Sequence, residues 1–427
     1  MPLRRSLAEP CPRTSISFVP QSPTPGKGER SDVVIAGGGI VGLAVAWRAR
    51  EHGMSVTLVE GDKLGRAASH VAAGMLAPVA EVEFGPAARR SLALGLRAAA
   101  AWPAFVTELS AAAGSRVSLR TSGTLLLARD DDEARELGRQ LELRRSLQLR
   151  VNRLLPSEAR EREPALAPTL RAALECPEDH SVDPREVLAA LRRACERAGV
   201  AIREHTPAEG LEVDRAGGRV TGVRLAGGEL LEADRVVIAA GAWSRRLTAP
   251  LVGDGIPVRP VKGQIMRLRD PAGPGLLTRA VRYEGGYVLP RGDGRYVLGA
   301  TVEERGFELA PTAGGLYELL REARELVPGI TELELEEVSV GLRPGTPDNA
   351  PLIGHGPVEG LLLATGHHRN GILLAPLTAE LIVGLLDREA RAEDHDTLLQ
   401  ACAPARFSTA PEGAAGDQAG TLAEAPR

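Results

Sequence analysis

The sequence predicts an α/β fold, α+β overall, in which a parallel-sheet domain is interleaved with an antiparallel-sheet domain. Near the N-terminus, an apolar strand at 32–36 leads through a glycine-rich turn into a helix and a second strand at 56–59. Near-continuous apolar strands recur at 233–240 and 361–364, as expected for strands buried on both faces of a parallel sheet. Between them, residues 256–301 carry the alternating strands typical of an antiparallel sheet.

The first turn contains the pattern Gly37-x-Gly39-x-x-Gly42. Gly37 permits the tight turn, Gly39 lets the backbone approach a pyrophosphate, and Gly42 lets helix and strand pack closely. The predicted helix, Val41 to Arg50, directly follows Ile40 and offers free N–H groups and a positive dipole end to the phosphates. We therefore expect all five residues to take part in nucleotide binding.

An acidic residue completes this pattern. Glu60 ends the second strand, 18 residues after Gly42, and Gly61 follows it. A carboxylate at this place suits a ribose hydroxyl and repels a 2′-phosphate. The order of strand, glycine turn, helix, strand and acid predicts a Rossmann-like dinucleotide site; the alternative is an ordinary glycine turn in an α/β domain.

Small residues dominate the next segment, from Gly65 to Pro78. Next to a nucleotide fold they would allow the backbone to lie flat against a cofactor. Taken alone, the pattern favours a loop or helix packed for steric reasons.

The remaining elements follow from local patterns. Asp183 and Pro184 predict the N-cap and first residue of a helix that ends at Gly199. Gly292-Asp293-Gly294 predicts a hairpin turn. The other expected helices are 87–113, 132–147, 156–160, one with Leu316, Leu319, Leu320 and Ala323 on one face, and one from about Ile372. The other expected strands are 122–128, 200–203, 211–213, 220–225, 263–269, 278–283, 287–291, 296–300 and 331–340.

Composition excludes several classes of function. The 427 residues are 43% hydrophobic, enough for a sizeable core, and the net charge of -4 argues against nucleic-acid binding. Four cysteines without CxxC spacing suit a reducing compartment and predict no metal site. The most apolar stretch, 372–386, contains Pro376 and Glu380 and is interpreted as a buried helix, so we expect no integral membrane segment and a cytoplasmic protein.

Two C-terminal segments could carry chemistry. Arg343 follows a predicted strand, where an arginine either binds a carboxylate in a bidentate manner or braces a loop. The turn from Thr365 to Gly371 leads into a helix whose N-terminus could stabilise the anion of a reduced flavin; the alternative is a plain strand–turn–helix join. His367 and His368 are adjacent, so they cannot easily share one metal ion.

Taken together, these segments resemble the glycine oxidase branch of the D-amino acid oxidase family, the ThiO-type enzymes of thiamine biosynthesis. The resemblance covers about residues 31–395. The matching segments are Gly37–Gly42, Glu60, Ala72–Leu76, Gly341–Thr346 and Gly366–Pro376.

The resemblance implies noncovalent FAD and oxidative deamination of glycine and other small amino acids to the imine or 2-oxo acid, with ammonia and hydrogen peroxide. The alternative is a sarcosine or D-amino acid oxidoreductase that uses another electron acceptor. A hand-off of the product to thiazole synthase and a homo-oligomer are also implied.

The resemblance also assigns residues. Arg343, Tyr287 and Arg369 would bind the substrate, and hydride transfer to the flavin needs no protein acid or base. The residues that would contact FAD are Gly37, Gly39, Ile40, Val41, Gly42, Glu60, Gly61, Ala68, Ser69, Ala73, Gly74, Met75, Ala208, His367, His368, Arg369, Asn370, Gly371, Ile372 and Leu373.

The same reasoning divides the chain. The expected parts are a disordered extension (1–30), a Rossmann-like FAD-binding domain (31–112, 170–248 and 342–395), an antiparallel-sheet substrate domain (113–169 and 249–341) and a disordered tail (396–427). One departure concerns the pocket: the family often has histidine two residues before the tyrosine, where this chain has Gly285, and a roomier pocket is expected. The C-terminal core carries no cysteine for a covalent flavin.

Overall fold

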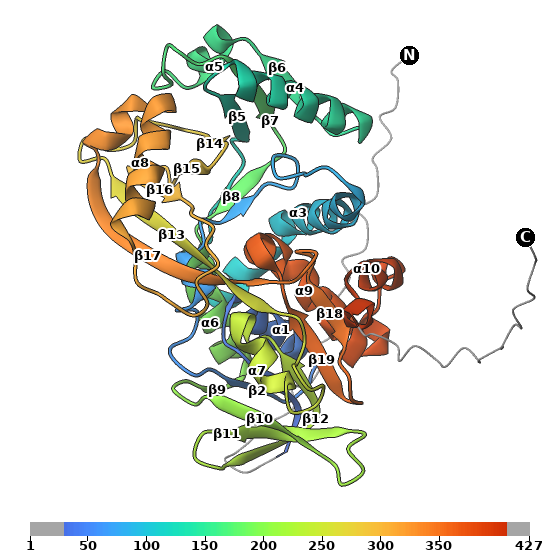
Figure 1. The fold of residues 1–427 in the computed structure, drawn as a ribbon. Helices are drawn as coiled ribbons and strands as arrows, with labels where there is room; N and C mark the ends of the chain where they lie inside the picture. Colours follow the sequence, from blue (N-terminus) through green and yellow to red (C-terminus); the bar gives the residue numbers. More distant parts are fainter. Residues whose placement is uncertain (1–29, 408–427) are drawn as a thin grey trace, which may run out of the picture.

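The computed structural model describes residues 30–407. Apart from Arg30, the predicted N-terminal extension lies outside the described residues, as do residues 408–427 of the predicted tail. Two large sheets organise the described chain, one at the lower end of Figure 1 and one at its upper left, with long helices beside them. Each sheet has eight strands.

The first sheet is the predicted parallel one. Its central strands run in the order β9-β2-β1-β12-β19, and every neighbouring pair among them is parallel. β18 extends the sheet in antiparallel fashion beyond β19, and an antiparallel hairpin of β10 and β11 branches from the start of β12. The strands are β1 (Ser31–Ala36), β2 (Val56–Val59), β9 (Ala201–Arg203), β10 (Ala208–Val213), β11 (Val220–Leu225), β12 (Leu230–Ile238), β18 (Leu352–His355) and β19 (Leu361–Thr365).

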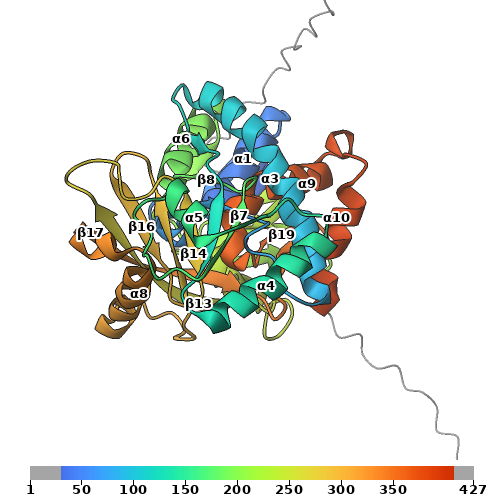
Figure 2. The ribbon, with the colours of Figure 1, turned by 90° about the horizontal axis from the view of Figure 1, so that it is seen from above.

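Four helices cover this sheet and form its core, and Figure 2 shows them gathered on one side of the molecule. They are α1 (Ile40–Glu51), α3 (Pro86–Ala113), α6 (Pro184–Ala198) and α9 (Gly371–Leu386). Trp47 of α1 and Trp102 of α3 both meet Phe105 edge-to-face, with centroids 5.6 and 5.3 Å apart. The predicted caps of α6 are confirmed, because the Asp183 carboxylate accepts from Arg185 N–H and Gly199 takes the left-handed conformation.

One helix is apolar enough to raise the question of a membrane. By length and composition, residues 368–386 could span a bilayer, but 67% of that segment is buried inside the protein. It packs against both α1 and α3. The interpretation of this stretch as a buried core helix is therefore confirmed.

The second sheet is mostly antiparallel, in the order β17-β13-β16-β15-β14-β5-β7-β6. The helix α8 (Ala313–Leu326) packs on it through the predicted apolar face. The strands are β5 (Thr124–Ala128), β6 (Asn152–Leu154), β7 (Ala172–Cys176), β13 (Arg259–Arg269), β14 (Ala280–Tyr283), β15 (Gly286–Pro290), β16 (Arg295–Gly299) and β17 (Glu334–Gly345). The helices α4 (Asp131–Ser146) and α5 (Pro156–Arg162) lie at its far end (Figure 1).

Three details of the prediction are wrong here. The domain boundary at residue 170 is misplaced, because β7 pairs with β5 and β6 of the second sheet. The sheet is not purely antiparallel, since β14 and β5 run parallel. The last strand begins at Glu334, after a short 3-10 helix over Pro328–Glu332, and continues to Gly345 across the predicted boundary at 341/342.

The predicted start of the disordered tail, at residue 396, is also wrong. Residues His395–Cys402 form the helix α10, and a 3-10 turn follows at Pro404–Phe407. Leu398 and Cys402 are buried against the first domain, and the Arg406 guanidinium donates to both carboxylate oxygens of Asp348, at 2.9 and 3.1 Å. One apolar helical face and one ion pair thus hold a segment whose composition indicated disorder.

A short three-stranded sheet joins the two domains, with β8 (His180–Val182) between β3 (Met75–Leu76) and β4 (Leu119–Arg120). Beside it lies a buried polar cluster. Both carboxylate oxygens of Asp179 accept backbone N–H groups, from Val79 at 3.1 Å and from Ala80 at 2.8 Å. The fully buried Arg144 donates to the carbonyls of the same two residues, both at 2.9 Å. Burial raises the pKa of Asp179 to about 7.

This raised pKa predicts a pH dependence of stability. Because the folded pKa lies above the ordinary value of about 3.9, the contribution of Asp179 is fully present below pH 4 and is lost as the pH rises through 7. The unfolding free energy of the wild type, relative to Asp179→Asn, should therefore fall between pH 4 and 7, with a slope approaching about 1.4 kcal/mol per pH unit. Urea unfolding at several pH values measures this, and parallel curves for the two proteins would contradict it.

The glycine turn sets how closely α1 approaches the sheet. A Cβ added to Gly42 would lie 1.9 Å from the Gly37 carbonyl oxygen, and one added to Gly37 would lie 2.4 Å from the Ala239 carbonyl oxygen. Gly37 also has a φ of +116°. No side chain can enter at either position unless the helix moves.

We therefore expect Gly42→Ala to lower the unfolding free energy, by about 1–3 kcal/mol for an overpacked contact. The matched control is Gly138→Ala in α4, where an added Cβ would meet nothing within 4 Å. That change should raise stability by up to about 1 kcal/mol, because alanine favours helix more than glycine does. Equal stability of the two variants in urea unfolding would show that the contact is not restrictive.

Candidate active site

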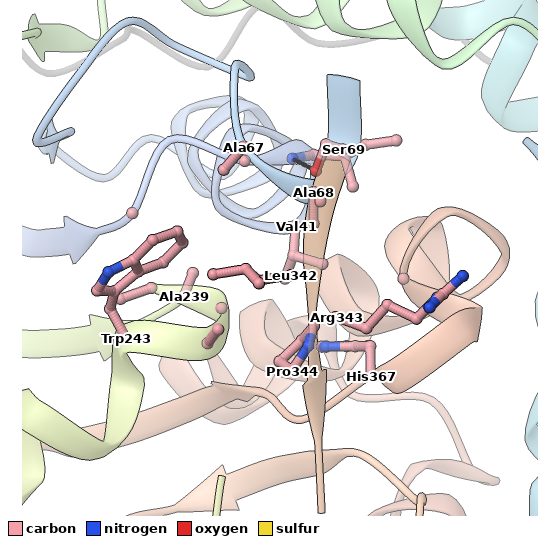
Figure 3. A pocket seen from close by; sticks show the side chains of 18 of the residues that line it. Val41, Ala67, Ala68, Ser69, Ala239, Trp243, Leu342, Arg343, Pro344 and His367 are labelled. Atoms are coloured by element: carbon pink, nitrogen blue, oxygen red, sulfur yellow. Dashed lines mark hydrogen bonds between the residues drawn. The ribbon is translucent and has the colours of Figure 1, made fainter. Parts of the chain in front are cut away.

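A cavity of about 760 Å³ runs from the glycine turn of the first domain to the face of the second sheet. Figure 3 shows Ala67, Ala68 and Ser69 on one side of it and Pro344 and His367 on the other, with Trp243 and Arg343 far apart along it. Its volume falls within the range of about 300–1,000 Å³ usual for ligand sites.

The first end of the cavity is the predicted nucleotide site. Gly37, Gly39, Ile40 and Val41 line it, at the N-terminus of α1. Glu60 lines it too, and its carboxylate accepts from Gly38 N–H at 2.7 Å. This bond holds the acid against the turn, where the sequence pattern expects the ribose of a dinucleotide.

Small residues form one wall, as expected. Ser69 lies in the short helix α2 (Ala68–Val71), and its hydroxyl accepts from Ile40 N–H at 3.1 Å, which ties this wall to the start of α1. Gly74 has a φ of +88°, and a Cβ there would lie 2.2 Å from the Val182 carbonyl oxygen. The backbone of this wall therefore lies against β8 on one side and the cavity on the other.

Arg343 stands at the second end of the cavity. It does not follow a strand, as predicted, but lies inside β17, opposite Val261 of β13. Its Nη1 donates to the Thr301 carbonyl at 3.0 Å and, more weakly, to the Lys262 carbonyl at 3.4 Å. Among the described residues, none accepts a hydrogen bond from its Nε or Nη2, so both remain available to a ligand.

A glycine makes room for each polar group at this end. A Cβ on Gly263 would lie 2.4 Å from Arg343 Nη1, and a Cβ on Gly299 would lie 2.5 Å from the Tyr287 hydroxyl. No described residue is hydrogen-bonded to that hydroxyl. Burial raises the pKa of Tyr287, and the charge of Arg343 partly offsets the effect. The tyrosine is therefore a neutral hydrogen-bond donor beside a free guanidinium edge.

The turn before α9 closes the cavity. The side chain of Arg369 forms an ion pair with Glu83, while the residue lines the cavity. The His367 ring shares a 2.9 Å hydrogen bond with the Thr378 hydroxyl, and burial lowers its pKa to about 4. Burial and nearby arginines, Arg369 first, also lower the pKa of His368 to about 4. Both rings are neutral at pH 7.

Most of the predicted site residues meet in this one cavity, and three do not line it: Gly42, Asn370 and Leu373. Gly42 faces Gly37, as packing requires. The Leu373 side chain is buried in the helical core, and its carbonyl accepts from the Trp102 indole at 2.9 Å. Their assigned contacts with a cofactor, like those of the lining residues, remain predictions.

Sequence reasoning missed several lining residues: Glu81, Trp243, Arg246, Ile265 and Leu309. A signal existed for one of them. Ile265 lies two residues after Gly263 on β13 and is paired with Gly299 of β16. Gly299 is in turn paired with Tyr287 of β15, so these residues share one face of the sheet. Glu81 and Leu309 come from loops whose sequence gives no such periodicity.

The departure at Gly285 does not bear on the cavity wall. Gly285 lies in the turn between β14 and β15 and does not line the cavity. A Cβ there would lie 2.1 Å from the carboxylate of Glu322 in α8. The expectation of a roomier pocket therefore has no support from this residue.

The residues present fit a dinucleotide with a planar group. Gly39 and Gly241 both line the cavity, and a Cβ on either would meet no protein atom nearer than the Ser69 hydroxyl, at 3.2 Å from Gly39. Lys63, Arg66 and Arg246 add positive charge along the cavity for phosphates. Among the described residues, no three His, Cys, Asp or Glu side chains gather as metal ligands, and the described cysteines are buried away from the cavity.

Comparison with known proteins agrees with this geometry. The chain is 36% identical over 367 residues to the glycine oxidase of Geobacillus kaustophilus. The alignment covers 86% of this chain and 95% of that protein. The crystal structure of glycine oxidase from Geobacillus kaustophilus superimposes with a TM-score of 0.81 at 35% identity, covering 89% of this chain and all of that one.

A longer relative carries a second part. The bifunctional protein ThiO/ThiG of a Synechocystis species is 36% identical over 387 residues, which is 89% of this chain and 54% of that protein. This chain thus spans about half of the bifunctional relative. A family model described as FAD dependent oxidoreductase, DAO, matches residues 32–385, and the chain therefore belongs to this family of FAD enzymes.

Proposed function

We propose that this protein oxidatively deaminates glycine and other small amino acids to the imine or 2-oxo acid, with release of ammonia and hydrogen peroxide. The observation that carries the proposal is the pairing of Arg343 and Tyr287 at the end of an FAD cavity. A protein that only stored a flavin would have no need of a free guanidinium edge beside a tyrosine hydroxyl. Relatives named glycine oxidase, similar over most of their length, support the same choice.

The substrate carboxylate is bound by charge and by geometry. Two guanidinium nitrogens of Arg343 without described acceptors match the two oxygens of a carboxylate. The Tyr287 hydroxyl can donate to the same group, because burial keeps it protonated. The carbonyls of Thr301 and Lys262 hold the guanidinium in place through Nη1.

The amine needs no protein base in this scheme. Bound FAD would supply the acceptor for the hydride from the substrate Cα, with oxygen as the final oxidant. The backbone carbonyl of Arg369 can accept a hydrogen bond from the amine. His367 and His368 stay neutral above about pH 4, so neither adds a charge that would repel a cationic substrate.

The imine has a use that the bifunctional relatives suggest. In Synechocystis and in Trichormus variabilis, a ThiO part is fused to a ThiG part in one chain. We propose that this protein serves thiamine biosynthesis and hands its product to a separate thiazole synthase in the cytoplasm. We also propose that the protein assembles into a homo-oligomer.

The visible spectrum of the purified protein tests the proposal first. Glycine added without oxygen should bleach the flavin absorbance, and readmitted oxygen should restore it with stoichiometric hydrogen peroxide. A flavin that glycine leaves oxidised, while sarcosine or a D-amino acid bleaches it, would replace the substrate assignment. Bleaching without peroxide on reoxidation would indicate another electron acceptor.

Arg343→Ala should raise the Michaelis constant for glycine while FAD stays bound. Loss of a buried charge-assisted pair costs about 2–4 kcal/mol, which corresponds to roughly 30- to 1,000-fold. Arg343→Lys should fall between, because lysine keeps the charge but loses the fork. The matched control is Arg269→Ala on β13, whose half-exposed side chain pairs with Glu336 and should leave the constant unchanged. An unchanged constant in Arg343→Ala would remove the carboxylate clamp from the proposal.

The turnover rate at saturating glycine should rise with pH as the bound amine loses its proton. Between pH 5 and 9 the two arginines at this end of the cavity, Arg343 and Arg369, keep their charge, and His367 and His368 stay neutral. We therefore expect none of these four groups to add a second inflection to the pH profile of the rate. Steady-state rates across this range measure it. A bell-shaped profile would show that a protein acid takes part.

A further inference from the structure

Four carbonyls of the wall segment His70–Gly74 accept hydrogen bonds from other parts of the chain. The His70 carbonyl accepts from Arg185 Nε at 3.2 Å and from Arg267 Nη2 at 2.9 Å. The Ala73 carbonyl accepts from Arg291 Nη2 at 2.7 Å, and the Gly74 carbonyl accepts from Val182 N–H at 3.0 Å. Three guanidinium groups therefore converge on one short stretch of backbone.

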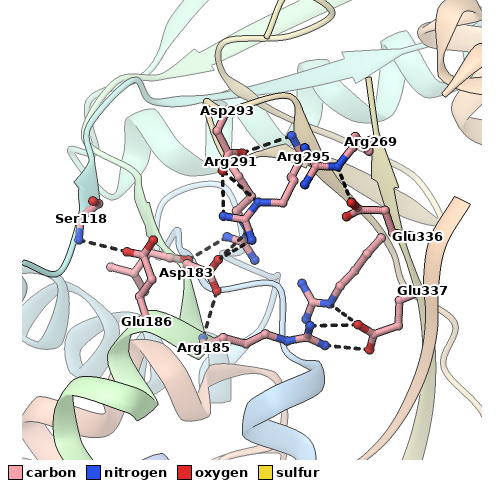
Figure 4. A network of polar contacts seen from close by, with 12 residues as sticks. Ser118, Asp183, Arg185, Glu186, Arg269, Arg291, Asp293, Arg295, Glu336 and Glu337 are labelled. Atoms are coloured by element: carbon pink, nitrogen blue, oxygen red, sulfur yellow. Dashed lines mark hydrogen bonds and ion pairs between the residues drawn. The ribbon is translucent and has the colours of Figure 1, made fainter. Parts of the chain in front are cut away.

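These arginines come from both domains, and Figure 4 labels two of them, Arg185 and Arg291. Arg185 lies in the first turn of α6, whereas Arg267 lies on β13 and Arg291 directly follows β15. Glu337 of β17 accepts two hydrogen bonds from Arg185, at 2.9 and 2.7 Å. Asp183 lies 3.7 Å from Arg291 Nε. The network thus fixes the wall segment from the second sheet and α6 together.

Arg291 is the most enclosed member. Its side chain is 3% exposed, and its Nε is buried without a hydrogen-bond partner among the described residues. Burial lowers its pKa, with Asp183 acting in the opposite direction, but a guanidinium remains charged at neutral pH. A positive charge that one anion only partly balances therefore lies directly behind the cavity wall.

The charge acts on a peptide group that faces the cavity. In a trans peptide the C=O and N–H point in opposite directions. Arg291 holds the carbonyl of the Ala73–Gly74 peptide, so the Gly74 N–H points away from Arg291. Ala73 and Gly74 both line the cavity, and no described residue accepts a hydrogen bond from the Gly74 N–H.

We propose that Arg291 is a positioning residue for the flavin: it holds and polarises the Ala73–Gly74 peptide so that the Gly74 N–H donates to bound FAD. Reduction places negative charge on the flavin, so a polarised donor with a cation behind it favours the reduced state. Arg291 thereby raises the midpoint potential of FAD. The proposal depends on FAD binding and not on which amine the enzyme oxidises.

The test measures the midpoint potential of FAD in the holoenzyme by equilibration with a redox dye, without any amine substrate. At a fixed dye potential, Arg291→Met should lower the ratio of reduced to oxidised FAD at least tenfold, which is about 30 mV for a two-electron couple. Arg291→Lys keeps the charge and should stay within about threefold of the wild type by the same relation. An unchanged ratio in Arg291→Met with FAD bound would overturn the proposal.

Two further variants separate this role from a merely structural one. Arg295→Gln removes an arginine that pairs with Asp183 and Asp293 in the same network but donates to no carbonyl of the wall segment, so the potential should change much less than in Arg291→Met. Asp183→Asn keeps an oxygen to cap α6 but removes the anion beside Arg291, and it should raise the ratio of reduced FAD.

The second of these variants keeps the test decisive if Arg291→Met fails to fold or to retain FAD. A lower or unchanged ratio in Asp183→Asn would then overturn the proposal. Because no substrate is present, failure to oxidise glycine cannot be confused with either result.

Discussion

The close contact between α1 and β1 is the constraint on which the cofactor end of the site depends. It exists because neither Gly37 nor Gly42 carries a side chain, and a Cβ at Gly42 would lie 1.9 Å from a backbone oxygen. With the helix seated there, its first residues Ile40 and Val41 line the cavity, and the Glu60 carboxylate accepts from Gly38 N–H at 2.7 Å. The acid, the turn and the helix dipole are therefore placed by one steric condition.

At the substrate end of the cavity, glycines on the strands of the second sheet again leave space that side chains would otherwise fill. β13 and β17 keep one register from Arg259 to Arg267, and β15 pairs with β16 from Tyr287 to Pro290, so the positions of Arg343 and Tyr287 are fixed by strand register. Gly263 and Gly299 leave the space that the guanidinium and the phenol occupy. A register shift of one residue would turn both polar groups to the opposite face.

Local signals predicted most of the helices and strands, because caps, glycine turns and apolar periodicity depend only on residues close together in the sequence. The α6 caps at Asp183 and Gly199 are examples. Which strands pair with one another depends on residues far apart in the sequence. For this reason the place of β7 in the second sheet and the parallel pairing of β5 with β14 were missed. In the site, the glycine pattern and the C-terminal turn led to the cavity, whereas Glu81 and Leu309 reach it from loops that no periodicity marks.

The arginines show why such roles cannot be separated from sequence alone. Arg343, the arginine that could either bind a ligand or brace a loop, uses Nη1 for backbone carbonyls and leaves two nitrogens without acceptors among the described residues. Arg291 instead gives both Nη atoms to carbonyls, those of Val182 and Ala73. The chemistry of the two side chains is the same. The supply of acceptors around each one decides whether the guanidinium meets the ligand itself or acts on the backbone that does.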